Sequence, residues 1–373
     1  MPKKLRLPWT PREVPLHRVA VDNLAHALVG AALGRAVADP QVPRAATLGV
    51  IAANAPDWTE YLIGLPGDRS TFLVLHRGIT HSLVGALVEI VGLTLLVGLG
   101  ARWWVRWRGG VAPPWGPLAL CIATTVLSHL YMDWQGSYGL RPFLPWSATW
   151  YYADWVAIAD PFFWLVPLIA LAWGTERHWI PLAAVFMVGG IATAAVVLNA
   201  DLAARWVLVT YFALGVVAAI GWVRYWFGPV ARRRVAVFAL VILAAYAGAQ
   251  GIVAHFEKAA IHRRAMQRFG PAARWAPLTR IGTPFQWDEI YASPDTVAGS
   301  GWQLPRHLDA PIVQRALRDT REGRAMAQFA RFLVAEVDSS GVGEVTVYLR
   351  DARYARAGGR GWGVVSVSLR RSP

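Results

Sequence analysis

The feature that most constrains this fold is a series of long apolar segments between residues 80 and 254. A transmembrane helix needs about 20 mainly apolar residues, because each residue adds about 1.5 Å and the hydrocarbon core is about 30 Å thick. Segments that approach this length predict six spans, at residues 80–99, 117–132, 155–172, 179–199, 205–222 and 235–254. We therefore expect a mainly α fold: a polytopic membrane helix bundle.

The composition agrees with a membrane location. Hydrophobic residues make up 55% of the chain and charged residues 16%, whereas a soluble domain has about 25% charged residues. Many of the twenty tryptophans lie near the ends of the apolar segments, where indole rings favour the membrane–water interface. We attribute the net charge of +14 to basic loops that set topology and contact anionic headgroups. The expected partner is the lipid bilayer, and no nucleic acid partner is expected.

The chain divides into four parts by composition. Residues 1–19 read as a basic, proline-rich arm, 20–175 as a helical core, 176–255 as additional membrane spans, and 256–373 as a small extramembrane α+β domain. In the core we expect a short helical hairpin (22–37 and 44–53) and then a loop at 61–75. In the last part we expect one amphipathic helix at 312–332 and alternating strands at 344–349 and 364–369.

Ionisable residues in the core alternate between the starts and the ends of successive helices. In an antiparallel array, which short connections favour, all of them belong to the same end of the bundle. The residues are His26, Asp57, His76, His81, His129, Asp133 and Asp160. Ionisable groups beside a membrane span are rare and usually functional. The sequence therefore predicts one polar site at one end of the bundle.

The types and spacing of these residues fit a metal site. His129 and Asp133 are four residues apart and share a helix face. Thr80 is placed to cap the next span, and Asp160 to cap the helix that starts at Pro161. Imidazoles and carboxylates bind zinc, manganese or iron. Because seven candidates exceed the four ligands of one tetrahedral zinc, we expect one or two divalent ions, with zinc favoured.

Such a site suits hydrolysis of a phosphoester by metal-activated water. Arg77 and Arg141 are candidate phosphate contacts, since guanidinium matches phosphate geometry. Each residue also has a simpler interpretation: a lone histidine at a membrane interface is often only hydrogen-bonded, and Asp160 could serve only as a cap. The alternative function is a metal-binding transporter or a non-catalytic membrane protein, since intramembrane histidine and aspartate also mark ion pathways.

Several short motifs resemble one family. In chain order they are Asp22-Asn23-Leu24-Ala25-His26, Asn54-Ala55-Pro56-Asp57, His76-Arg77-Gly78-Ile79-Thr80-His81-Ser82, Ser128-His129-x3-Asp133 and Asp160-Pro161. Over residues 20–175 the chain resembles the YdjM-type family of membrane-bound, metal-dependent hydrolases of bacterial inner membranes. The resemblance implies a hydrolase with metal-binding histidines and aspartates, similar in helical character to zinc-dependent phospholipase C enzymes. It makes a phospholipid or another phosphoester the natural substrate.

One position departs from the family pattern. Thr59 stands where the family often has a second acidic residue, and we expect the neighbouring Glu60 to substitute. Glu60 and Arg77 are our candidate catalytic residues. Basic loops after the first, third and fifth spans predict that the metal site and the C-terminal domain share the periplasmic side of the inner membrane, whereas the basic N-terminal arm argues for the opposite orientation.

Overall fold

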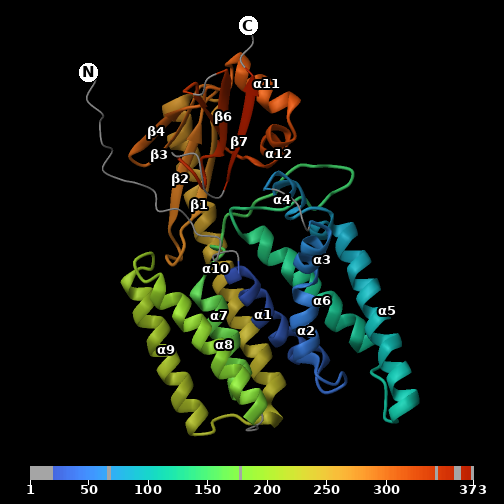
Figure 1. The fold of residues 1–373 in the computed structure, drawn as a ribbon. Coiled ribbons are helices and arrows are strands. Elements are labelled where there is room, and N and C mark those ends of the chain that lie inside the picture. Colours follow the sequence, from blue (N-terminus) through green and yellow to red (C-terminus); the bar gives the residue numbers. More distant parts are fainter. Residues whose placement is uncertain (1–19, 65–68, 176–178, 341–342, 357–362, 371–373) are drawn as a thin grey trace.

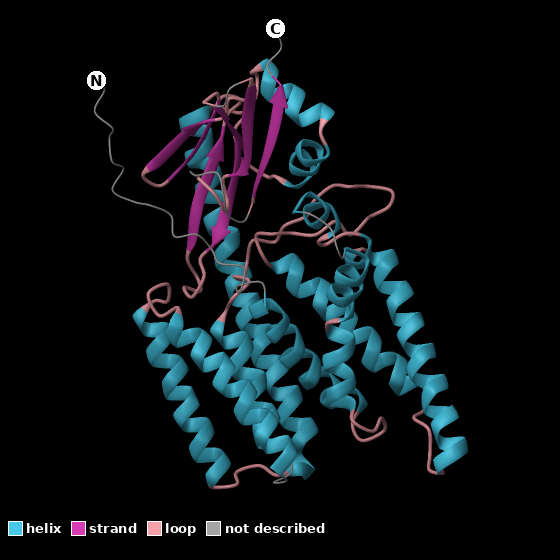
Figure 2. Ribbon diagram, viewed as in Figure 1, coloured by secondary structure: helices cyan, strands magenta, loops and turns pink. Residues whose placement is uncertain are grey.

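The computed structural model describes a helical bundle that carries a smaller domain of strands and short helices at one end (Figures 1 and 2). The described residues are 20–64, 69–175, 179–340, 343–356 and 363–370. The basic arm predicted at residues 1–19 lies outside them.

The bundle is built around a central helix, α1 (Ala20–Ala38), which contacts α2, α6, α7 and α10. The other helices are α2 (Ala45–Ala53), α3 (Ala55–Gly64), α4 (Arg69–Leu75), α5 (Leu83–Arg108), α6 (Trp115–Gln135), α7 (Pro161–Trp173), α8 (Trp179–Leu198), α9 (Arg205–Val223) and α10 (Arg232–Phe269). A 3-10 turn, η2 (Ile79–His81), leads into α5. Ser82, not Thr80, caps α5, because its hydroxyl accepts from the Gly85 amide at 3.0 Å.

Within the described residues, four helices are long and apolar enough to cross a membrane: α5, α6, α9 and α10. Helix α7 and the searched part of α8, Ala183–Leu198, are shorter apolar helices. The predicted number of six spans is therefore not confirmed. Helix α7 starts at Pro161 and not at 155, since residues before Asp160 form an irregular connection and Asp160 caps the helix.

The predicted hairpin at the start of the core is present as α1 and α2, and its helices touch through glycine. A Cβ atom at Gly34 would lie 2.1 Å from the Ala45 carbonyl oxygen, and one at Gly49 would lie 2.0 Å from that of Gly30. Small residues allow two membrane helices to approach this closely. The close packing fixes where α2 ends and therefore where α3 begins.

The loop predicted at residues 61–75 is wrong. Helix α3 continues to Gly64, and α4 occupies Arg69–Leu75. Leu73 of α4 is 1% exposed and belongs to the same apolar cluster as Met326 and Phe329 of the C-terminal domain. The helix is stabilised by this packing, and its partner lies some 250 residues away, beyond what a local pattern can reveal.

The C-terminal domain contains two antiparallel sheets. One has the order β1-β2-β3-β4 and the other the order β5-β6-β7. The strands are β1 (Arg274–Thr279), β2 (Trp287–Ala292), β3 (Thr296–Gly299), β4 (Trp302–Pro305), β5 (Leu333–Asp338), β6 (Glu344–Asp351) and β7 (Val364–Arg370). The strands predicted at 344–349 and 364–369 lie within β6 and β7.

The single amphipathic helix predicted at 312–332 is wrong, because the segment forms two helices, α11 (Pro311–Asp319) and α12 (Arg321–Phe329). Thr320 separates them with an extended backbone, and its hydroxyl accepts from the Gly323 amide at 3.0 Å, which starts the second helix.

The domain is joined to the bundle by α10 and by polar contacts to the α6–α7 connection. Helix α10 runs without a break through the predicted boundary at residue 256 and leads into the domain. Arg331 forms an ion pair with the buried Asp154 at 3.0 Å, and Arg353 donates to the Ser137 carbonyl at 2.6 Å. The domain therefore lies against the end of the bundle that carries the loop of His76 and His81 (Figure 1).

Candidate metal centre

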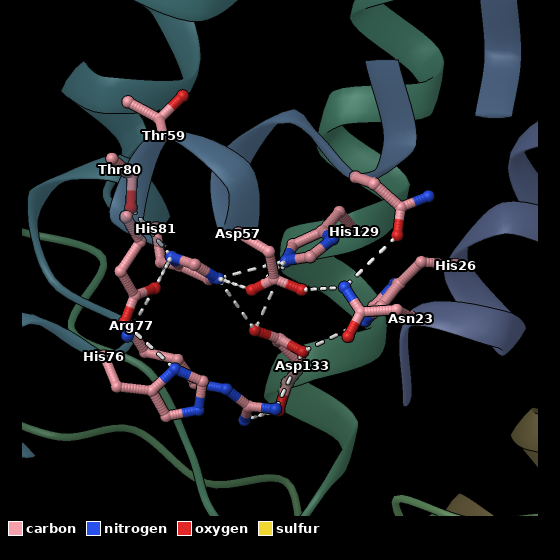
Figure 3. A network of polar contacts seen from close by, with 12 residues as sticks. Asn23, His26, Asp57, Thr59, His76, Arg77, Thr80, His81, His129 and Asp133 are labelled. Carbon is pink, nitrogen blue, oxygen red and sulfur yellow. Dashed lines mark hydrogen bonds and ion pairs between the residues drawn. The ribbon is translucent and has the colours of Figure 1, made fainter. Parts of the chain in front are cut away.

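Side chains from four elements meet at the end of the bundle that faces the C-terminal domain (Figure 3). Asp57 comes from the first turn of α3, His81 from η2, and His129 and Asp133 from one face of α6. His26 of α1 stacks on His129 with the ring centroids 3.9 Å apart. All five are buried, and the three imidazoles are at most 1% exposed.

Four of their atoms lie close together: the Nε2 atoms of His81 and His129 and one carboxylate oxygen each of Asp57 and Asp133. His81 Nε2 is 3.0 Å from His129 Nε2, 3.3 Å from Asp57 Oδ1 and 3.4 Å from Asp133 Oδ2. His129 Nε2 is 3.8 Å from Asp57 Oδ1 and 3.6 Å from Asp133 Oδ2. Tetrahedral zinc ligands at about 2.0–2.1 Å from the ion are about 3.4 Å from one another. The distances from each carboxylate oxygen to the two imidazole nitrogens are therefore close to those of ligands around a zinc-sized cation.

The donor chemistry also favours a positive charge at this point. His129 Nδ1 is 2.7 Å from the Ala53 carbonyl oxygen, which can only accept, so Nδ1 carries the proton and Nε2 presents a lone pair. His81 Nδ1 lies 3.0 Å from the Thr80 hydroxyl and 3.4 Å from Glu60 Oε2, and these two contacts orient its Nε2 toward the same point. Two imidazole lone pairs and two carboxylates facing one another repel unless a cation or protons lie between them. The residues present therefore fit a divalent metal.

Glu60 and His76 form a second layer beside this group. Glu60 Oε1 is 2.9 Å from His76 Nδ1, and Glu60 Oε2 accepts from the Arg77 amide at 3.2 Å. Burial and the nearby Asp57 charge raise the pKa of Glu60 to about 9. Burial and the Arg77 charge lower the pKa of His76 to about 3. Asp57, Glu60 and His76 also form a group that could hold an ion, as do His26, His129 and Asp133.

Arg77 is almost fully buried and contacts the metal group through Asp133. Its guanidinium donates to Asp133 Oδ1 at 2.8 Å and to the carbonyl oxygens of Asp133 and Gly139 at 3.1 Å each. It also lies over the Tyr138 ring, 4.6 Å from the centroid. These contacts orient Asp133. Arg141 donates to the Val74 carbonyl at 2.7 Å and so holds the end of α4, which leads into His76 and Arg77.

Asp160 is placed differently from the other predicted ligands. It caps α7 through the Phe162 amide at 2.9 Å, and its other oxygen accepts from Tyr246 at 2.7 Å and from Gln250 at 3.4 Å. In the part of the chain that the structure describes, it belongs to none of the three candidate metal groups. It lines a small pocket of about 30 Å³ that also reaches Asp133, room for about one or two water molecules.

Two residues near the site were missed as functional candidates. Asn23 donates to Asp57 Oδ2 at 2.7 Å, on the oxygen opposite the metal group. Its spacing of three from His26 places both on one helix face, a signal that could have identified it. Tyr138 packs on Phe329 of the C-terminal domain, a contact that no local pattern encodes. Thr59 lies apart from the cluster and donates to the Ala55 carbonyl (Figure 3).

Comparison with known proteins gives one match. The model of the family described as YdjM inner membrane protein matches residues 21–256, a segment that holds every residue of the metal group. No curated protein and no solved structure matches the chain. The matched segment is more than half of the chain and contains three of the four candidate spans and the first part of the fourth, so the protein belongs to the YdjM inner membrane protein family.

Proposed function

We propose that this protein is a metal-dependent hydrolase that acts on a phosphoester or lipid-like substrate at the membrane surface. The observation that carries the proposal is the convergence of two imidazole lone pairs and two carboxylates, from Asp57, His81, His129 and Asp133, on one buried point. A bound zinc ion, or manganese or iron in its place, would supply a Lewis acid and a water nucleophile at neutral pH.

The depth of the site favours an enzyme over a transporter. Transporter sites lie near the bilayer midplane on broken helices. Here the donors come from a 3-10 turn, from the first turn of α3 and from the last two turns of α6, beside loops that contact the C-terminal domain. A substrate whose reacting group lies in the headgroup region would meet the site at this level.

The surrounding residues have separate roles in this proposal. Glu60 orients His81 and His76, and it is the group that can hold a proton near neutral pH, because its pKa is raised to about 9 by burial and by Asp57. Arg77 is a positioning residue, since its guanidinium holds the Asp133 carboxylate. Carboxylates that orient ligating imidazoles commonly change metal affinity by about 10–100-fold when they are removed.

We further propose that the site faces the periplasm of a bacterial inner membrane. Arginines gather at the opposite end of the bundle, at the end of α1 and in the α1–α2 turn, at the end of α5, and from the α9–α10 connection into the start of α10: Arg35, Arg44, Arg102, Arg106, Arg108, Arg224, Arg232, Arg233 and Arg234. Loops rich in lysine and arginine remain in the cytoplasm. Reporter fusions at residue 110 and after the last residue should report opposite sides, and a common side would refute this orientation.

Metal analysis tests the proposed function. Protein purified in detergent from metal-replete cells should hold stoichiometric metal, which His81→Ala and His129→Ala should lose and the exposed control His255→Ala should keep. The same four proteins should be assayed with a soluble chromogenic phosphodiester and with phospholipid vesicles. Wild-type protein without metal would refute the proposal. Bound metal without hydrolysis of either substrate would favour the alternative, a metal-binding transporter.

A further inference from the structure

The connection between α6 and α7 holds two large aromatic side chains away from the protein. In the turn at residues 140–150, Trp146 is 80% exposed and Phe143 45% exposed. The turn is ordered by its own contacts, because the Ser147 amide donates to the Phe143 carbonyl at 2.9 Å and the Phe143 ring packs edge-on against Tyr151 at 5.4 Å. Two exposed aromatic groups held near one another form a candidate contact surface if they adjoin other exposed apolar side chains.

Helix α5 shows where the bilayer lies relative to this turn. Trp103 and Trp107 are exposed near the far end of the helix, as expected for one membrane–water interface. A hydrocarbon core of about 30 Å corresponds to about 20 residues of helix, which places the other boundary at residues 83–87. Leu83 is 51% and Leu87 61% exposed there, as lipid-facing side chains are.

The turn lies at this second boundary. The Leu83 amide donates to the Pro142 carbonyl at 2.9 Å, so the start of α5 and the start of the turn are at one level. Phe143 follows directly and Trp146 three residues later. Their exposed side chains therefore lie close to the level at which the lipid-facing surface of α5 begins.

We propose that Phe143 and Trp146 insert into the headgroup region of the leaflet beside the metal centre, so that the occupant of this surface is the lipid bilayer itself. Aromatic rings prefer this region, where one edge is apolar and the other wet. The turn is held against the end of α4, next to His76, because Arg141 donates to the Val74 carbonyl at 2.7 Å and stacks on Trp150. The metal centre is thereby held at the height of lipid phosphates.

Fluorescence quenching by depth tests this proposal and needs no hydrolysis, so its outcome is independent of the proposed function. Single cysteines are labelled with an environment-sensitive dye and the protein is placed in phosphatidylcholine nanodiscs with nitroxide lipids. Cys121 is fully buried and should stay unlabelled. The probe is Trp146→Cys, with Leu95→Cys in the middle of α5 as the membrane control and Ser300→Cys on the β3–β4 turn as the solvent control.

At Trp146→Cys we expect stronger quenching by headgroup nitroxide than by nitroxide deep in the acyl chain, and the reverse order at Leu95→Cys. Ser300→Cys should be quenched by neither. Quenching at Trp146→Cys no greater than at Ser300→Cys would overturn the proposal. A probe shielded from aqueous iodide yet not quenched by lipid would also overturn it, because the surface would then be covered by a protein. An unchanged helical circular dichroism spectrum and a single gel-filtration peak for each variant show that the protein is folded.

Discussion

Replacing Glu60 with glutamine should remove the pH dependence of metal affinity without removing the site. Glu60 has a pKa raised to about 9 by burial and by the Asp57 charge, so its carboxyl is protonated at neutral pH before metal binds. A divalent ion beside it favours the carboxylate, and binding therefore releases this proton. Since protons compete with metal below that pKa, raising the pH should strengthen binding.

The size of the effect follows from one proton. Between about pH 6 and about pH 8 the affinity attributable to Glu60 should rise about tenfold per pH unit, or about 1.4 kcal/mol each. His76 contributes nothing to this slope, because burial and Arg77 lower its pKa to about 3 and it stays neutral throughout. Glutamine keeps the shape of the side chain and its contact with the Arg77 amide, but has no proton to lose.

Competition with a chromophoric chelator at several pH values measures the slope, and calorimetry in buffers of different ionisation enthalpy counts the released protons. The Glu60→Gln variant should lose one unit of slope and one released proton relative to wild type. Glu344→Gln, on an exposed residue of β6, is the control and should change neither. If Glu60→Gln keeps the wild-type slope, the proton does not reside on Glu60 and the electrostatic reasoning fails.

Three other results are expected. Gly34→Ala places a Cβ atom 2.1 Å from a backbone carbonyl of α2 and should destabilise the bundle by about 1–3 kcal/mol in thermal unfolding, whereas Gly92→Ala, with open space around it, should not. Arg331→Met leaves Asp154 buried and unpaired and should cost about 3–5 kcal/mol, seen as faster proteolysis of the C-terminal domain. In a solution whose free metal concentration is about 1,000 times the dissociation constant, bound metal should add about 4 kcal/mol to the free energy of unfolding. A chelator should remove this stabilisation from wild-type protein and should change nothing in His129→Ala.

The sequence could predict that these histidines and aspartates lie together, because its signals are local. His129 and Asp133 follow helical spacing, and the alternation of His26, Asp57 and His81 between helix starts and ends needs only antiparallel helices. The cap at Asp160 was also readable from the following proline and is present. What the local pattern could not decide is whether the Asp160 carboxylate faces the metal group, because its partners, Tyr246 and Gln250, lie far along the chain on α10.

The errors have the same origin. Helix α4 exists because Leu73 packs against α12, and the break at Thr320 lets α12 turn to make that contact. Neither follows from periodicity, since both depend on a domain that begins some 200 residues after α4. The number of spans differs for another reason. Helix α7 begins only at Pro161, after its cap Asp160, so it is shorter than the apolar segment 155–172 from which a full span was predicted.

The C-terminal domain supports side chains that surround the candidate metal centre. Phe329 and Tyr354 of the domain pack around Tyr138, and Tyr138 supports the guanidinium of Arg77, which in turn holds the Asp133 carboxylate. A displacement of the domain would therefore remove the support of Arg77 and leave Asp133 free to rotate. Because a ligand must be held within about 0.5 Å of its productive position, the domain should matter for metal affinity although it supplies no ligand to the group around His81 and His129.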